Sequence, residues 1–245
     1  MPLIQMVLNM MTDDIVAHLQ SIANADIAEH SQRFFKTCPG EYGAGDKFLG
    51  IRVPVLRNLV KQYKNAELAD AIKLLHNEYH EIRLFALLLM VALYQSSKQI
   101  EQQKAIFDSY LANTKWINNW DLVDCSAHKI LGHYLLDKNR EVLFQLAVSN
   151  SLWERRIAMM ATYTLIKHQQ FEQTFALAEL LLDDNEDLIH KVAGWMLREV
   201  GKIDLAAELR FLDLHYQCMP KTMLRYAIEK LPQSQRKHYL KVSTA

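Results

Sequence analysis

The sequence predicts an all-α protein built from repeated helical pairs, and three observations support that prediction. Only 7 glycines and 5 prolines occur in 245 residues, too few for the frequent turns of β-sandwiches and barrels. Half of the residues are hydrophobic, so the chain can bury a continuous core, and the abundant leucine, alanine, glutamate and lysine favour helices. A helical pattern centred on an alanine also recurs along the chain.

The recurring pattern occurs in five predicted helical segments. In chain order they are residues 81–90, 121–131, 153–165, 188–200 and 223–231, centred on Ala86, Ala127, Ala158, Ala193 and Ala227. The alanines are 41, 31, 35 and 34 residues apart, which leaves room for two helices and a turn, as in HEAT-like pairs stacked into a solenoid. Chance alignment of a common residue is the alternative, but the shared flanking residues favour true repeats.

The remaining distinctive segment, residues 36–63, contains 4 of the 7 glycines. It contains no Gly-Lys-Ser/Thr sequence and follows no predicted strand, so it does not match a phosphate-binding P-loop. We expect a glycine-rich connection between helices. Arg52 and Arg57 near its end could contact phosphate or face solvent.

No linker divides the chain, so we expect residues 11–245 to form a single domain, with residues 1–10 as a possible N-terminal extension. The apolar start has no basic region and no small-residue cleavage site, and is therefore a poor signal peptide. The longest apolar run, residues 84–94, is too short to span a bilayer. Three scattered cysteines are typical of free thiols in a reducing compartment, so we expect a cytoplasmic protein.

Charge alone does not indicate a nucleic-acid-binding protein, because 28 basic residues are balanced by 28 acidic ones. Residues 190–245, however, contain 10 Lys and Arg against 5 Asp and Glu, which allows a local basic surface. Two residues before the central alanine, the last three repeats carry Arg156, Lys191 and Arg225. These positions could line one face along a phosphate backbone, or the long side chains could simply cover packed helices.

Trp120 and Asp124 form the strongest local candidate for chemistry. They are four residues apart in a predicted helix, so their side chains share a face. An aromatic ring beside a carboxylate suits a cationic or positively developing substrate. The alternative is a core tryptophan with an aspartate that stabilises a helix start. Asp121 could be the functional carboxylate instead, but it faces away from Trp120.

Two further candidates combine aromatic and basic residues. Trp195 should share a helix face with Lys191 and Arg198, an arrangement that suits nucleic-acid contacts, although a tryptophan at this position can also be core. Of the adjacent Arg155 and Arg156, we expect one to face outward. Other catalytic templates are absent, because the sequence has no H-E-x-x-H, zinc-binding Cys/His array or G-x-S-x-G. A lone aspartate is the remaining acid–base candidate.

Five segments resemble, in order, the signature segments of the AlkD-type, HEAT-like DNA glycosylases of the DNA alkylation repair family: FLGIRVPVLR, INNWDLVD, SLWERRIAMMA, DLIHKVAGWMLREVGK and MPKTMLRYAIEKL. They span residues 48–231. The resemblance implies a C-shaped right-handed superhelix whose basic concave face holds duplex DNA. It also implies hydrolysis of the N-glycosidic bond of positively charged N3- and N7-alkylated purines without base flipping, by a monomer that needs no metal or organic cofactor.

The resemblance also implies roles for individual residues. Trp120 and Trp195 match the two tryptophans of the aromatic cleft, and Asp124 matches the catalytic aspartate. Arg156 matches an arginine that contacts the DNA backbone, and Arg198 a further basic contact. The other expected DNA-binding residues are Lys191, Arg225, Arg52 and Lys221.

Two features depart from the family pattern. The net charge is zero, and Asn119 replaces the aromatic residue common beside Trp120. Two alternative functions therefore stay open: a non-catalytic binder of DNA structure, and a HEAT-type protein-interaction scaffold. The charge of Asp124 separates the first alternative from an enzyme, and salt-dependent duplex binding separates both from the scaffold.

Overall fold

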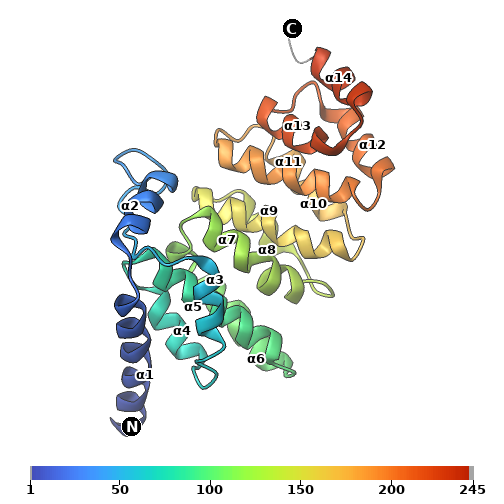
Figure 1. Ribbon diagram of the computed structural model, residues 1–245. Helices are drawn as coiled ribbons and strands as arrows, with labels where there is room; N and C mark the ends of the chain where they lie inside the picture. Colours follow the sequence, from blue (N-terminus) through green and yellow to red (C-terminus); the bar gives the residue numbers. More distant parts are fainter. Residues whose placement is uncertain (1, 243–245) are drawn as a thin grey trace. The chain divides into compact units, whose positions relative to one another are not determined.

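The chain folds into α-helices joined by short connections, as seen in a computed structural model that describes residues 2–242 (Figure 1). No β-strand occurs in this range, where only an isolated bridge joins Lys47 and Tyr79. The all-α prediction is therefore confirmed. The helices form two compact units, an N-terminal unit of residues 1–126 and a C-terminal unit of residues 127–245. The single domain, the extension at residues 1–10 and the C-shaped superhelix stay predictions.

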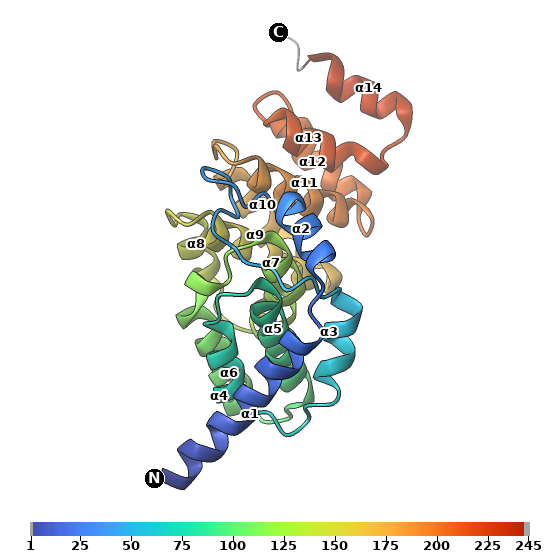
Figure 2. The same ribbon diagram turned by 60° about the vertical axis from the view of Figure 1, so that its left-hand side comes forward.

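The N-terminal unit is organised around helix α5 (His80–Ser96). Its helices are α1 (Pro2–Ser21), α2 (Ala25–Phe34), α3 (Val53–Val60), α4 (Leu68–Leu75), α5 (His80–Ser96), α6 (Ile100–Ala112) and α7 (Trp120–Ala127), with a 3-10 turn at Thr114–Trp116. Helices α3, α4 and α6 pack against α5 (Figure 2), and α1 packs against α4. Residues 80–91 of α5 are all buried, because neighbours cover this helix on several sides.

The C-terminal unit is a two-layered stack of helical pairs. It contains a π-helical turn (His128–Gly132), α8 (Glu141–Ala147), α9 (Leu152–Lys167), α10 (Glu172–Leu180), α11 (Asp187–Gly201), α12 (Leu205–His215), α13 (Lys221–Ala227), a 3-10 turn (Ile228–Lys230) and α14 (Gln233–Val242). The π turn, α9, α11 and α13 pack in succession, while α8, α10 and α12 form the second layer. The predicted helical repeat is confirmed.

Small residues allow the close packing of the repeats. The five repeat alanines are at most 1% exposed. Neighbouring helices approach even more closely at two glycines. A Cβ atom added to Gly132 would lie 2.2 Å from the Ala161 carbonyl oxygen, and a Cβ atom added to Gly194 would lie 2.3 Å from the Met223 carbonyl oxygen. The recurring alanines thus mark buried helix–helix contacts, as the sequence pattern predicted.

The glycine-rich part of the segment, residues 36–52, lies in the connection between α2 and α3 as expected, whereas residues 53–60 of the segment form α3 itself. The end of this connection is fixed by Glu81 at the start of α5, whose carboxylate accepts hydrogen bonds from the backbone N–H groups of Leu49, Gly50 and Ile51 at 2.8–3.2 Å. Gly50 has a φ of 78°, a conformation that favours glycine. A Cβ atom there would lie 2.0 Å from the Asn24 carbonyl oxygen.

No helix within residues 2–242 is both long enough and apolar enough to cross a lipid bilayer.

Candidate functional site

Helix α7 carries the Trp120–Asp124 pair. The preceding residue, Asn119, begins this helix: its side-chain oxygen accepts a hydrogen bond from the Trp120 N–H at 2.9 Å, and its carbonyl accepts one from Val123 at 3.2 Å. The α-helical conformation places Trp120 and Asp124 one turn apart, as their spacing predicted. Both are half-buried, whereas the neighbouring Leu122 is fully buried. The tryptophan is therefore not a fully enclosed core residue.

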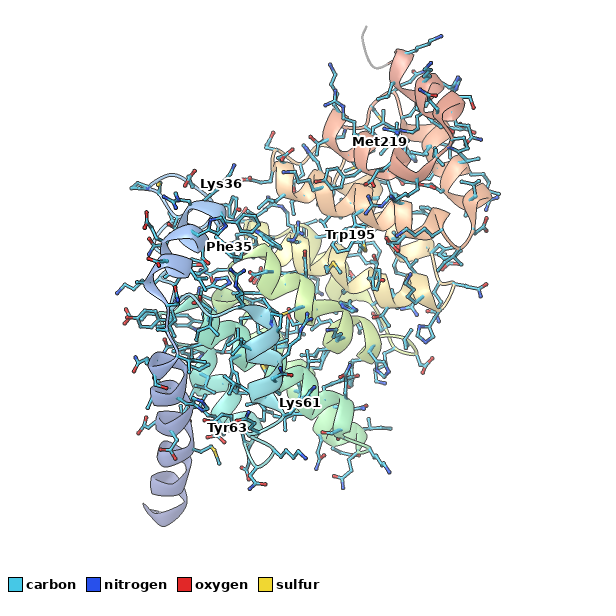
Figure 3. The ribbon with its side chains drawn as sticks, in the orientation of Figure 1. Phe35, Lys36, Lys61, Tyr63, Trp195 and Met219 are labelled. Atoms are coloured by element: carbon cyan, nitrogen blue, oxygen red, sulfur yellow. The ribbon has the colours of Figure 1, made fainter. Side chains whose placement is uncertain are left out.

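An aromatic cluster holds the Trp120 ring in place. Phe35 stacks on it with ring centroids 5.2 Å apart, and Phe34 at the end of α2 meets it edge-on at 5.9 Å. Phe35 in turn stacks on Phe48 at 5.1 Å, and its position is labelled in Figure 3. Phe34 is 57% exposed. No sequence pattern indicated this cluster, because Phe34 and Phe35 lie 86 and 85 residues before Trp120.

A buried histidine fixes the start of α7. His80 bridges two carboxylates: its Nε2 lies 2.8 Å from Asp121 Oδ2 and its Nδ1 lies 3.2 Å from Asp46 Oδ2. Burial alone lowers the pKa of His80, but the charge and hydrogen bond of Asp121 and the hydrogen bond of Asp46 outweigh burial and raise the pKa to about 9. His80 is therefore an imidazolium at neutral pH, with both nitrogens donating. Asp121 thus serves to bind His80 at the start of α7, and the catalytic role expected of Asp124 stays a prediction.

Asp46 extends the same network to two more side chains. Arg83 donates to it at 2.7 Å and Asn119 at 3.3 Å. Burial raises the pKa of Asp46, but the His80 hydrogen bond and the Arg83 charge outweigh burial and lower the pKa below its ordinary value. Asn119, which departs from the family pattern, thus links the start of α7 to this ionic network. No local sequence signal indicates this ionic network, because its residues come from three separate segments of the chain.

A cavity of about 530 Å³ adjoins the network inside the N-terminal unit. Phe35, Phe48 and His80 line it, and Asp121 contributes a carboxylate. Arg52, an expected phosphate contact, lies at this cavity and is exposed. The cavity was not predicted from the sequence.

The two adjacent arginines of α9 are both engaged within the C-terminal unit. Arg155 forms an ion pair with Asp184, at 2.6 Å, and donates to the Ser149 carbonyl oxygen. Arg156 is only 5% exposed and donates to the Leu188 carbonyl oxygen at 2.7 Å. The expectation that one of them faces outward is wrong, because each guanidinium joins α9 to the segment around the start of α11. The DNA contact expected of Arg156 stays a prediction.

The other expected DNA-binding residues of this unit differ in their surroundings. Lys191 pairs with Asp187 at 2.6 Å, and Arg198 pairs with Glu229 while keeping 14% of its side chain exposed. Lys221 and Arg225 on α13 are exposed.

Trp195 on α11, labelled in Figure 3, is half-buried and fixed by a carboxylate. Its indole N–H donates to Glu199 Oε1 at 3.1 Å, and its ring centroid lies 6.5 Å from that of Tyr163. The expected cations beside it, Lys191 and Arg198, have acidic partners of their own. Glu199 was not among the predicted site residues, although its position four residues after Trp195 indicates a shared helix face.

The structure thus supports two local arrangements, one around Trp120 and Asp124 in the N-terminal unit and one around Trp195 in the C-terminal unit. Their union into one aromatic cleft stays a prediction. Among residues 2–242, no three His, Cys, Asp or Glu side chains are arranged to hold a metal ion.

Comparisons with known proteins agree with this architecture. A family model described as "DNA alkylation repair enzyme" matches residues 15–231. A solved structure described as a predicted DNA alkylation repair enzyme from Enterococcus faecalis is similar, with a TM-score of 0.68 and 18% sequence identity over 86% of this chain and 97% of that one. At this identity the likeness shows the fold. No curated protein sequence matches the chain significantly.

The family match covers most of the chain, including both tryptophans and Asp124. The protein therefore belongs to the DNA alkylation repair enzyme family and has a role in the repair of alkylated DNA.

Proposed function

We propose that this protein is a DNA glycosylase that hydrolyses the N-glycosidic bond of positively charged N3- and N7-alkylated purines in duplex DNA. Family membership supports the role in alkylation repair. The observation that carries the finer proposal is the placement of Trp120 and Asp124 one turn apart on α7. A carboxylate beside an aromatic ring supplies what cleavage of a cationic nucleotide requires.

Asp124 would act on the deoxyribose. When the glycosidic bond breaks, its electron pair leaves with the alkylated base, which becomes neutral, and positive charge develops on the sugar. A carboxylate near the sugar stabilises this oxocarbenium-like state and orients the water that adds to C1′. The products are the free base, an abasic site and the proton that the water loses as it adds to C1′, and water is the only co-substrate. The proposed enzyme therefore works without a metal or an organic cofactor, and as a monomer.

Trp120 and Trp195 would contact the sugar-phosphate backbone through their ring faces. Trp120 is held by the rings of Phe34 and Phe35, and the only polar group of Trp195 is occupied by Glu199. Rings restrained in this way can hold a sugar without reorganising when DNA binds. Many glycosylases enclose a flipped base in a pocket. Here we propose that the base stays unflipped and that the instability of the lesion itself supplies the specificity.

The expected basic residues would hold the phosphates. Arg52, Lys221 and Arg225 are exposed and can reach a phosphate directly. Lys191 and Arg198 would exchange their carboxylate partners for phosphate. Arg156 is the least accessible of the set, and its charge would act on the backbone over a short distance.

A direct test is to incubate the full chain with duplex DNA that contains 7-methylguanine and to measure the freed base by chromatography. We expect release well above the spontaneous rate. No release above that rate, together with tight duplex binding, would favour the non-catalytic binder of DNA structure. Absence of salt-dependent duplex binding would favour the protein-interaction scaffold.

We also propose that the protein acts in the cytoplasm. Cys38 and Cys218 are exposed, Cys125 is half-buried, and all three are free thiols. Unpaired thiols of this kind persist in a reducing compartment.

A further inference from the structure

Glu199 is a buried carboxylate with three donors around it. It is 4% exposed. Its Oε1 accepts from the Trp195 indole at 3.1 Å and from the Lys202 ammonium at 2.5 Å, while its Oε2 lies 3.4 Å from the Lys167 ammonium. Trp195 is one turn before Glu199 in α11, Lys202 directly follows the last residue of α11, and Lys167 is the last residue of the adjacent α9. One carboxylate therefore holds two ammonium groups and one aromatic ring together.

The charges of this cluster do not balance. Burial raises the pKa of Glu199, but the hydrogen bonds and charges around it, chiefly those of Lys202, outweigh burial and lower the pKa below its ordinary value. Glu199 is therefore ionised at neutral pH and neutralises one of the two lysines. The side chains of Lys167 and Lys202 stay 42% and 44% exposed. The pair thus presents an unmatched positive charge to solvent.

Two other cations of the C-terminal unit are matched one to one. Arg155 pairs with Asp184, and Lys191 pairs with Asp187. At the lysine pair, by contrast, a further acid is shared: Glu229 interacts with Lys202 but also with Arg198 and Lys230. Glu208 also lies near Arg198, but burial raises its pKa to about 8, so it is mostly neutral at pH 7. Four cations (Lys167, Arg198, Lys202 and Lys230) therefore face two ionised carboxylates (Glu199 and Glu229), a surplus of two positive charges.

Aromatic rings border the lysine pair. The Lys167 ammonium lies 4.8 Å from the Tyr163 ring centroid, and the Tyr163 and Trp195 centroids are 6.5 Å apart. Both rings are half-buried, so part of each faces solvent. Cations interleaved with aromatic rings suit a nucleic-acid backbone, since the cations neutralise phosphates and the rings contact the sugars or bases.

We propose that Lys167 and Lys202 form a phosphate-binding pair for the DNA backbone, arranged by Glu199 next to Trp195. A backbone phosphate carries one negative charge, which matches the charge that Glu199 leaves unbalanced. Lys230 extends the same basic surface. This inference rests on the proposed function for the identity of the ligand and adds two contacts to it.

The alternative explanation is structural. Lys167 ends α9 and Lys202 follows the last residue of α11, where a cation interacts favourably with the helix dipole. Lysines with only that role would affect stability and leave DNA binding unchanged.

The test is the salt dependence of binding of the full chain to an undamaged duplex oligonucleotide. Each phosphate contact contributes about 0.9 to the slope of log K against log salt. We expect Lys167→Gln and Lys202→Gln each to weaken binding and to reduce that slope by about 0.9, and Lys167→Arg and Lys202→Arg to retain it. The matched control is Lys104→Gln, which removes the same charge from a lysine paired with Asp108 and should leave the slope unchanged.

Thermal melting of each variant checks the fold. Unchanged slopes for both Gln variants, with or without a lower Tm, would overturn the inference. If the wild type releases 7-methylguanine while the slopes stay unchanged, only the lysine pair fails. If the slopes fall as expected but no base is released, only the glycosylase activity fails. Absence of duplex binding by the wild type would overturn both.

Discussion

Two carboxylates on α7 have different surroundings although they are only three residues apart. Asp121 is held by the imidazolium of His80 and fastens the start of the helix. Asp124 is one turn from Trp120 and half-buried. Spacing alone indicated that Asp124 shares a face with Trp120, whereas the engagement of Asp121 depends on a residue 41 positions earlier.

The first prediction concerns Asp124. Asp124→Asn keeps the size and hydrogen-bonding capacity of the side chain but removes the charge that should stabilise the sugar cation. Such electrostatic contributions are commonly worth about 3–4 kcal/mol, so we expect base release to slow about a hundredfold or more. Single-turnover release of 7-methylguanine measures this, with duplex binding as a check of the fold. The control is Asp183→Asn at an exposed position. Equal rates for the wild type and Asp124→Asn would remove Asp124 from the mechanism.

The second prediction concerns the pH dependence that His80 confers. Its folded-state pKa of about 9 lies above the ordinary 6.5, so the stabilisation is fully present below pH 6.5 and is lost as the pH rises to about 9. The shift corresponds to a free energy of unfolding on the order of 3 kcal/mol. Denaturant unfolding at several pH values should show a decline through this window that is smaller in His80→Gln than in the wild type. An unchanged decline in His80→Gln would contradict the ionic bridge.

A control variant and a comparison with the wild type separate the effect of His80 from that of other groups. His168→Gln, at an exposed position, should keep the decline. Burial raises the pKa of Glu208 to about 8, against the smaller effect of the Arg198 charge, so stability that depends on Glu208 is lost between pH 4.5 and 8 in the wild type and in both variants. The difference between the wild type and His80→Gln therefore isolates the histidine.

At the scale of secondary-structure elements, the repeats of the C-terminal unit depend on how closely their helices approach. The packed alanines were recognisable in the sequence because they recur at a period of about one helical pair. Gly194 follows one of them directly, and its closest neighbours are the Met223 carbonyl oxygen and the Tyr226 Cβ of α13. No space remains for a side chain at position 194, although alanine has a higher intrinsic helix propensity than glycine.

The third prediction is therefore a reversal of the usual effect of glycine-to-alanine substitution. In a helix interior the change normally stabilises by up to about 1 kcal/mol. Gly194→Ala should instead destabilise by about 1–3 kcal/mol, because its Cβ would lie 2.3 Å from the Met223 carbonyl oxygen and force α11 and α13 apart. Denaturant unfolding measures the difference. Ala176→Gly at an exposed position of α10 calibrates helix propensity alone. A stabilised Gly194→Ala variant would show that the helices do not pack this closely.

At the scale of the whole molecule, a protein with no net charge is expected to bind a polyanion. The chain has equal numbers of basic and acidic residues, 28 each, but their charges are unevenly distributed. Many of the acids form ion pairs with basic residues within each unit. Arg155, Lys191 and Arg198 lose part of their charge in this way. Lys167, Lys202, Lys221 and Arg225 carry charge that is exposed.

The fourth prediction follows from these four cations. If the pair Lys167 and Lys202 contacts one phosphate and Lys221 and Arg225 contact one each, the slope of log K against log salt is about −2.7, and duplex affinity should fall about fortyfold between 50 and 200 mM salt. Fluorescence anisotropy with a labelled duplex measures it. Affinity that does not depend on salt would exclude a phosphate-binding surface and support the protein-interaction scaffold.

The sequence by itself determined the helical class, the repeat and the candidate pair on α7, since these depend on spacings within a single helix or between successive repeats. Hydrophobic and small residues at a helical period predict which faces are buried whatever the partner is. Trp120 and Asp124 are one turn apart for the same local reason.

The tertiary structure alone decided which polar groups meet. The bridge from His80 to Asp46 and Asp121, the pairing of Arg198 with Glu229 and the cluster around Glu199 join residues 31 to 41 positions apart. Charged side chains are long and carry no periodic pattern, so their partners depend on how separate helices pack. For this reason the sequence correctly predicted the position of Asp124 on its helix relative to Trp120. It did not predict the surroundings that leave Arg156 buried and the pair Lys167 and Lys202 with an unmatched positive charge.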